Sequence, residues 1–233
     1  MYPIAITTYN RYKYLTDTLS SLESTIENTN NVFLFDDCSN KKEHIDLLVK
    51  LESKYKVFRN AENMGTVLNT VKAIEYMYNN FDTEYMIITQ DDVLYSKIWF
   101  TRGIELLKNI NIDNKNIAYL CLFNKDKKCE EKYYIMECGH PGLITWIINR
   151  KFWKEYRKKH DLTDYMTDNI KQNEKSQVYK IKNIVDYKLS LRIYKMGWFV
   201  AKVGRSLVQH VGDISSLHNT DMSIHRSPNF VGG

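Results

Sequence analysis

The stretch Tyr85-Met-Ile-Ile-Thr-Gln-Asp-Asp-Val93 decides how the rest of the chain is interpreted. Its first residues are mostly apolar, and a short apolar run of this length predicts a buried β-strand. Two adjacent carboxylates at the end of such a strand repel each other, and burial strengthens that repulsion. A divalent cation removes the cost, because Mg²⁺ and Mn²⁺ prefer carboxylate oxygens. The stretch therefore predicts a metal-binding strand end, with a solvated turn that carries two aspartates as the alternative.

Strands and helices alternate through the first half of the sequence. Apolar runs predict strands at residues 3–8, 32–35, 55–58 and 85–89, and apolar residues at helical spacing predict helices after each of them. Asn10 is the predicted N-cap of the first helix, and Asn40 with Glu43 resembles a capping box that opens the second. This alternation of apolar strands and helices predicts an α/β fold with a parallel sheet covered on both faces.

The second half of the sequence is less regular. Further strands are predicted at residues 117–123, 132–136, 143–148, 199–203 and 206–209, and helices at 152–160 and 185–196. Gly197 is the predicted C-terminal cap of the last helix. The polar stretch 161–182 has no clear period, and we expect a mobile loop that closes over a bound substrate. This half is therefore predicted to be mixed α+β.

Length and composition are those of one globular domain. The chain has 233 residues, of which 43% are hydrophobic and 26% charged, enough to bury a core. No apolar run reaches the roughly 18 residues that span a bilayer, and the first residues do not resemble a signal peptide. The four cysteines lack metal-binding spacing, so free thiols and a cytoplasmic location are expected. A net charge of +5 permits a polyanionic partner without requiring one.

Polar residues follow three of the predicted strands directly, at residues 7–11, 36–37 and 91–92. In open α/β sheets, ligands bind outside the carboxyl ends of the strands, so these clusters form a candidate site. Residues 7–13 contain no glycine, which excludes the dinucleotide-binding G-x-G-x-x-G loop. A P-loop and the Gly-rich loop of sugar nucleotidyltransferases are absent as well. The sheet edge that remains offers hydroxyls, an amide, an arginine and two acidic pairs.

Several segments, in their order and spacing, resemble the GT-A glycosyltransferases of the large inverting family 2. These segments are residues 4–11, 35–39, 63–65, 89–92, 186–197 and 208–215. The resemblance covers most of residues 3–216. It implies a GT-A fold, which is a Rossmann-like, mostly parallel sheet flanked by helices. It also implies a single domain over residues 1–233, with a nucleotide-sugar-binding half at 1–110, an acceptor-side half at 111–216 and an irregular tail at 217–233.

The resemblance also implies roles for individual residues. Asp92 would coordinate the Mn²⁺ or Mg²⁺ ion that bridges the donor diphosphate, His210 would complete the metal shell, and Asp186 would be the catalytic base. Asp37 would accept a hydrogen bond from the base of the donor. The full set of implied nucleotide-binding residues is Thr7, Tyr9, Arg11, Asp37, Asn63, Gly65 and Asp91.

The implied reaction is chemically consistent with these residue types. A bound cation neutralises the negative charge of the departing diphosphate. A carboxylate beside the acceptor hydroxyl takes its proton, typically worth a factor of about 10² to 10⁴. Attack opposite the leaving group inverts the anomeric centre. The predicted function is metal-dependent transfer of a sugar from a nucleoside-diphosphate donor, a UDP-sugar, to an acceptor hydroxyl.

The acceptor is left open by the sequence. A surface saccharide is the first expectation, and a modified base in phage DNA is the alternative. Basic and aromatic residues interleave at 150–160, which suits a phosphate-rich acceptor but equally suits a solvated helix face. The alternative from a different functional class is a non-catalytic Rossmann-like module that binds a nucleic acid or a nucleotide. Asp91 and Asp92 argue against it, because without a metal they repel phosphates.

The sequence departs from the family pattern at three positions. Gln90 stands where the metal-binding D-x-D motif begins, Asp186 stands alone where two acids are common, and residues 66–70 lack the arginine that often follows the Asn-x-Gly turn. Diphosphate contacts must therefore come from elsewhere. Structural roles also remain open: Asp37 as part of a turn, Asp186 as a first-turn helix acid and His210 as a core histidine.

Overall fold

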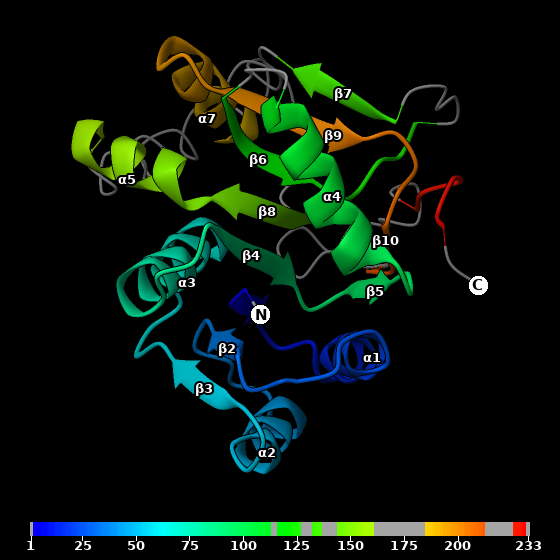
Figure 1. Cartoon of the computed structure of the whole chain (residues 1–233). Helices are drawn as coiled ribbons and strands as arrows, with labels where there is room; N and C mark the ends of the chain where they lie inside the picture. Colours follow the sequence, from blue (N-terminus) through cyan, green and yellow to red (C-terminus); the bar gives the residue numbers. More distant parts are fainter. Residues whose placement is uncertain are drawn as a thin grey trace, which may run out of the picture.

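The computed structural model describes residues 2–112, 116–126, 132–136, 144–160, 185–212 and 226–231. The elements, in chain order, are β1 (Ile4–Thr8), α1 (Tyr12–Glu23), β2 (Val32–Asp36), α2 (Lys42–Leu51), β3 (Lys56–Arg59), α3 (Thr66–Asn80), β4 (Tyr85–Gln90), β5 (Val93–Tyr95), α4 (Trp99–Ile112), β6 (Ile117–Cys121), β7 (Tyr133–Met136), β8 (Thr145–Asn149), α5 (Arg150–Lys159), α7 (Val185–Lys195), β9 (Phe199–Val203) and β10 (Val208–His210). Figure 1 shows their arrangement around a twisted central sheet.

The central sheet has eight strands in the order β3-β2-β1-β4-β8-β6-β9-β7. Its first four strands are all parallel, as the alternation of strands and helices predicts. β8 runs antiparallel to β4 and to β6, β9 is parallel to β6, and β7 is antiparallel to β9. The predicted α/β class, with a mixed second half, is confirmed.

Helices cover both faces of this sheet, which explains why every residue of β1, β2 and β6 is buried. Gly103 of α4 approaches Ile147 of β8 on one face. Trp146 precedes Ile147 in β8, so its side chain points to the opposite face of the sheet. There it lines an apolar pocket together with Trp153 of α5. In Figure 1, α1 and α4 lie on the first side, and α3, α5 and α7 on the second.

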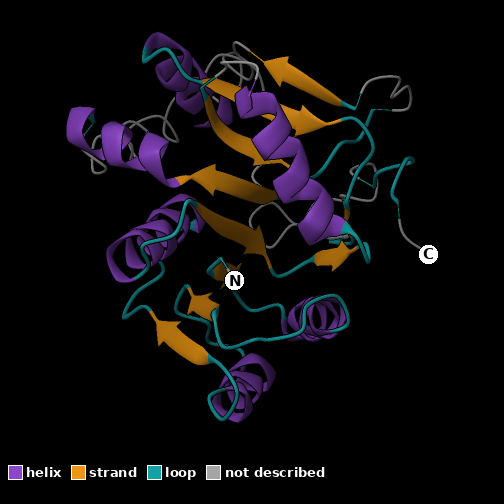
Figure 2. Cartoon of the chain, viewed as in Figure 1, coloured by secondary structure: helices purple, strands orange, loops and turns teal. Residues whose placement is uncertain are grey.

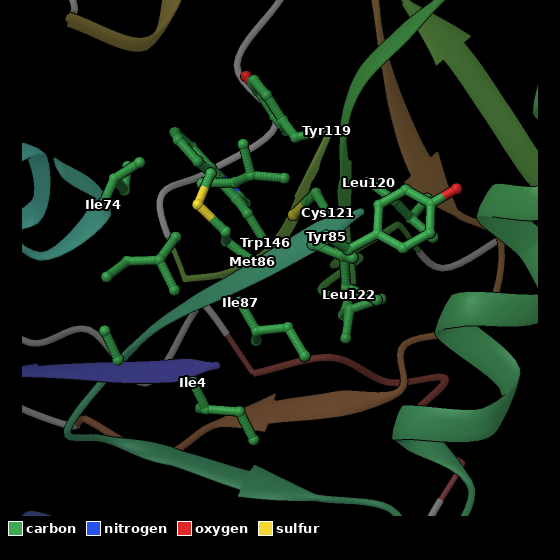
Figure 3. Close-up of a cluster of buried hydrophobic side chains, with 14 of the residues drawn as sticks. Ile4, Ile74, Tyr85, Met86, Ile87, Tyr119, Leu120, Cys121, Leu122 and Trp146 are labelled. Carbon is green, nitrogen blue, oxygen red and sulfur yellow. The ribbon is translucent and has the colours of Figure 1, made fainter. Parts of the chain in front are cut away.

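The core lies between these layers, and Figure 3 shows part of it. Tyr85 and Ile87 of β4 and Leu120 of β6 are fully buried within it. Trp146 stacks on Tyr119 with the ring centroids 4.2 Å apart and is 4% exposed. These contacts make Trp146 part of the packed core.

A small second sheet forms where the sequence predicts no strand pair. β5 and β10 pair antiparallel, with His210 opposite Val93, at the right of Figures 1 and 2. The Val211 N–H then donates to the Asp92 carbonyl at 2.9 Å. Through this pairing, the histidine near the end of the chain lies beside the acidic end of β4.

The two predicted helix caps are wrong. Arg11 precedes α1 without a side-chain cap, and Lys41, not Asn40, precedes α2. Asn10 adopts a left-handed backbone with φ of 56°, and its side-chain oxygen accepts the N–H groups of Asn40 and Lys41, each at 2.9 Å. Asn10 therefore ties the loop after β1 to the start of α2. By contrast, Gly197 ends α7 with φ of 79°, as predicted.

Other expectations fall partly outside the described residues. The polar stretch 161–182, Cys129 and Cys138 are outside them, whereas Cys38 and Cys121 are described and are not in a disulfide. Among the helices that the structure describes, none has the length and apolar character needed to cross a membrane.

Candidate active site

The carboxyl ends of β1, β2 and β4 meet at one edge of the sheet. Thr8 is in register with Asp36 of β2, and Thr7 with Gln90 of β4. The three polar clusters that follow these strands are therefore neighbours, as the parallel topology predicts. β10 adds His210 to the same edge through its pairing with β5.

Asp91 and Asp92 form a buried acidic pair, 3% and 1% exposed. The Arg11 Nη1 atom lies 2.6 Å from Asp92 Oδ2 and 3.4 Å from Asp91 Oδ1. His210 Nε2 lies 3.0 Å from the same Asp92 Oδ2 atom. The Thr8 hydroxyl donates to Asp91 Oδ2 at 2.6 Å. One arginine, one histidine and one hydroxyl thus offset the repulsion between the two carboxylates.

The environment drives the pKa values of the two acids apart. Burial and the adjacent Asp92 carboxylate raise the pKa of Asp91 to about 6. Burial also opposes ionisation of Asp92, but the His210 imidazole and the Arg11 guanidinium outweigh it and hold the pKa of Asp92 below its usual value. Asp92 therefore ionises at a lower pH than Asp91, and the ionised carboxylate is the state that a metal ligand needs.

The Asp92 and His210 pair fits a divalent cation. Asp92 Oδ1 is buried and has no hydrogen-bond partner among the residues described. Two neighbouring ligands of an octahedral ion, each about 2.1 Å from it, lie about 3 Å apart. Asp92 Oδ2 and His210 Nε2 lie 3.0 Å apart, a separation that neighbouring metal ligands can have and that a direct hydrogen bond also gives. Within the described ranges, no group of three or more His, Cys, Asp or Glu side chains is arranged to hold a metal. Donor phosphates and water would supply the other ligands.

Asp37 organises the loop between β3 and α3. Its Oδ1 atom accepts the Asn60 side-chain amide at 2.9 Å and the Met64 N–H at 2.8 Å, and its Oδ2 atom accepts the Gly65 N–H at 2.8 Å. Asn63 also accepts the Gly65 N–H, at 3.0 Å, while Gly65 adopts φ of 82°. The structure thus joins Asp37, Asn63 and Gly65, three predicted nucleotide-binding residues, into one unit.

Replacing Asp37 with asparagine should lower the free energy of unfolding by about 1–3 kcal/mol, because an amide nitrogen cannot accept the hydrogen bonds that the carboxylate accepts. Urea unfolding measures the change. Asp17→Asn is the matched control, since Asp17 is an exposed carboxylate on α1. Equal stability of the Asp37 and Asp17 variants would contradict the structural role of Asp37.

Thr7 and Tyr9 complete the predicted nucleotide side of the edge. Thr7 is 6% exposed, and its hydroxyl donates to the Thr89 carbonyl at 3.3 Å. The Tyr9 N–H donates to Asp91 Oδ2 at 3.4 Å. Thr7 therefore ties the end of β1 to β4, and Tyr9 ties the loop after β1 to the acidic end of β4.

Sequence reasoning missed a buried network behind the acids. Asp36 is fully buried and accepts hydrogen bonds from Ser39, including the Ser39 N–H at 3.0 Å, and from Arg59 Nε at 3.1 Å. His44 Nε2 lies 3.5 Å from Asp36 Oδ1 and 3.2 Å from the Thr8 hydroxyl, which itself donates to Asp91. The network therefore links the ends of β2 and β4. The one sequence signal for His44 is its spacing of four from the buried Leu48 on α2.

A model of the protein family described as glycosyl transferase family 2 matches residues 4–195. The chain belongs to glycosyl transferase family 2. No curated protein sequence matches it. The match includes every predicted site residue except His210, which β10 brings to the site from beyond the matched range.

Two solved structures show the fold of this family 2 chain. A crystal structure of GalNAc-T7 with UDP, GalNAc and Mn²⁺ superposes with a TM-score of 0.57 at 16% identity, covering 90% of this chain and 43% of that one. A crystal structure of residues 1–349 of S. aureus TarS superposes with a TM-score of 0.50 at 16% identity, covering 89% and 59%. The family 2 chain thus has the GT-A fold and spans about half the length of these neighbours.

The catalytic base implied by the family pattern is Asp186. In this family 2 chain it is the second residue of α7, in the first turn of the helix. The helix is the one predicted from the apolar spacing. The role of Asp186 remains a prediction, as do the individual nucleotide-binding roles.

Proposed function

We propose that this family 2 chain transfers a sugar from a nucleoside-diphosphate donor, a UDP-sugar, to an acceptor hydroxyl with the help of a divalent cation. One observation carries the proposal: Asp92 pairs with His210 at the carboxyl end of β4 and keeps one buried oxygen without a partner among the described residues. The ordered loop held by Asp37 lies at the same edge. The crystal structure of the neighbour GalNAc-T7 includes UDP and Mn²⁺, which supports the same choice of ligands here.

Each site residue has a separate role in the proposed reaction. Asp92 and His210 would hold a Mn²⁺ or Mg²⁺ ion, which neutralises charge on the departing diphosphate when bound. The loop held by Asp37 presents Asn63 and Gly65 to the nucleoside, and Thr7, Tyr9 and Asp91 form the wall beside it. Asp186 takes the proton of the acceptor hydroxyl as the new bond forms, on the face opposite the leaving group. Transfer with a single base of this kind inverts the anomeric centre.

A saccharide is the acceptor that we propose. In the basic run at 150–160, two arginines serve packing, and the exposed lysines fit the solvated helix face that is the alternative to a phosphate-binding surface. Arg150 pairs with Asp82 at 3.2 Å, and Arg157 pairs with Glu75 at 2.7 Å. Both guanidinium groups also lie over the Tyr78 ring. These contacts fix α5 against α3 and its end. No observation among the described residues favours a non-catalytic binding module, and a cytoplasmic location remains a prediction.

Thermal unfolding with a panel of nucleoside diphosphates tests the proposal. A ligand at 100 times its dissociation constant stabilises the folded state by about 2.7 kcal/mol. UDP with Mn²⁺ should raise the melting temperature more than GDP, ADP or CDP with Mn²⁺, and EDTA should remove the effect. Mn²⁺ without nucleotide is the control. An absence of any shift across the whole panel would contradict the proposed function.

A further inference from the structure

Arg11 occupies the position at which a cation would bind Asp92. Its Nη1 atom contacts the same Asp92 Oδ2 atom that His210 Nε2 contacts, at 2.6 Å and 3.0 Å. The Arg11 side chain is 16% exposed and that of Asp92 is 2% exposed. The Arg11 side chain is therefore the more accessible partner of this ion pair, although its Nε atom is buried.

The surroundings hold the guanidinium closely. Its Cζ atom lies 4.7 Å from the centroid of the Tyr14 ring. Gly212 is buried directly beside the ion pair. A Cβ atom on Gly212 would collide with Arg11 Nη2 and with Asp92 Oδ2. The position of Arg11 is thus defined by two carboxylates, an aromatic face and a backbone segment. These groups together form a binding site for a single positively charged group.

We propose that Arg11 is the resident counter-ion of the acidic pair, and that a divalent cation binds by displacing it from Asp92. This inference rests on the proposed metal role of Asp92. A buried acidic pair without a positive partner is costly, so Arg11 stabilises the protein before the cation arrives. The cation must therefore compete with an internal charge. Its apparent affinity is the intrinsic affinity of Asp92 multiplied by the fraction of molecules in which Arg11 has left Asp92.

The displacement also couples the cation to the nucleotide. Once released, Arg11 remains attached to the start of α1, beside the acidic edge, and needs a new anionic partner. The phosphates of the donor supply one, and a planar guanidinium suits phosphate oxygens. Residues 66–70 lack the arginine that often follows the Asn-x-Gly turn. A released Arg11 therefore provides a diphosphate contact that the sequence otherwise lacks, so cation and nucleotide should each favour binding of the other.

Calorimetric titration of Mn²⁺ into the full chain tests this proposal. Arg11→Met keeps much of the aliphatic stem and removes the charge. Without nucleotide, this variant should bind Mn²⁺ about tenfold or more tightly than the wild type, the range expected when a charge-assisted hydrogen bond no longer competes. The gain in Mn²⁺ affinity that UDP produces should shrink in the same variant. Arg59→Met is the matched control, because Arg59 pairs with buried Asp36 at 3.1 Å, not with Asp92. It should bind Mn²⁺ as the wild type does.

The possible outcomes separate this proposal from the metal role itself. If Arg11→Met binds Mn²⁺ no more tightly than the wild type, while the wild type binds it, the counter-ion role is refuted and the metal role stands. If neither protein binds Mn²⁺, even with UDP, both are refuted. Arg11→Gln removes the charge but keeps a polar side chain, and covers the case in which Arg11→Met does not fold. Its Mn²⁺ affinity should exceed that of the wild type, and an equal or lower affinity would refute the counter-ion role.

Discussion

Asp92→Asn should weaken UDP binding in the presence of Mn²⁺ by a factor of about 10² or more, because changes even to the outer shell of a metal site typically cost 10- to 100-fold. An amide is a poorer ligand than a carboxylate for a hard cation. The substitution also removes the charge that His210 and Arg11 share. Calorimetry with saturating Mn²⁺ measures the effect.

Two controls make this test specific. Asp17→Asn removes a carboxylate from the exposed face of α1 and should leave UDP binding unchanged. The melting temperature of each variant without ligand separates loss of the fold from loss of the site. If Asp92→Asn folds and binds UDP with Mn²⁺ as tightly as the wild type, the ion is held elsewhere.

Asp186→Asn should reduce turnover by a factor of about 10² or more and leave donor binding intact. The amide keeps the shape of the side chain but cannot accept a proton at neutral pH, and a positioned base contributes about 10² to 10⁴. Asp186 is in the first turn of α7, so a purely structural role at the helix start is the competing explanation. Asparagine supports a helix start almost as well as aspartate, and in that case turnover would hardly change.

This second test requires an identified acceptor, since slow hydrolysis of the donor does not use the base in the same way. Binding of UDP and rate of transfer are measured separately on the same preparation. Full transfer activity in Asp186→Asn would mean that the base lies elsewhere in the chain. The next candidates by sequence are Asp168, Glu174 and Asp213, which lie outside the described residues.

The sequence predicted those parts of the fold that depend on local signals. β4 and its acidic end follow from one apolar run, and the parallel order of β3, β2, β1 and β4 follows from alternating strands and helices. β5 has only three residues, too few for a periodic signal. β10 overlaps the predicted strand at 206–209, but its partner β5 lies more than a hundred residues earlier in the sequence, and no local pattern predicts that pairing. A family resemblance, and not a local pattern, pointed to His210.

The side-chain partners at the site were much less predictable. Asn10 has the composition of a helix cap, yet its left-handed backbone directs its amide to the start of α2 instead of α1. Asp37 was expected to meet a nucleotide base, and in the structure its oxygens already accept three hydrogen bonds from the loop after β3. Arg11 lies across the acidic pair. Such pairings depend on loop conformation, which no spacing of residue types encodes.

The most direct test of the account is calorimetric titration of UDP into the wild-type protein, once with saturating Mn²⁺ and once with EDTA. The geometry of Asp92 and His210 predicts clear binding with Mn²⁺ and an affinity at least about tenfold lower with EDTA, as expected when an ion that bridges the diphosphate to a carboxylate is removed. Equal affinity in the two titrations, or no binding of UDP in either, would contradict a metal-dependent nucleotide-sugar site at the end of β4.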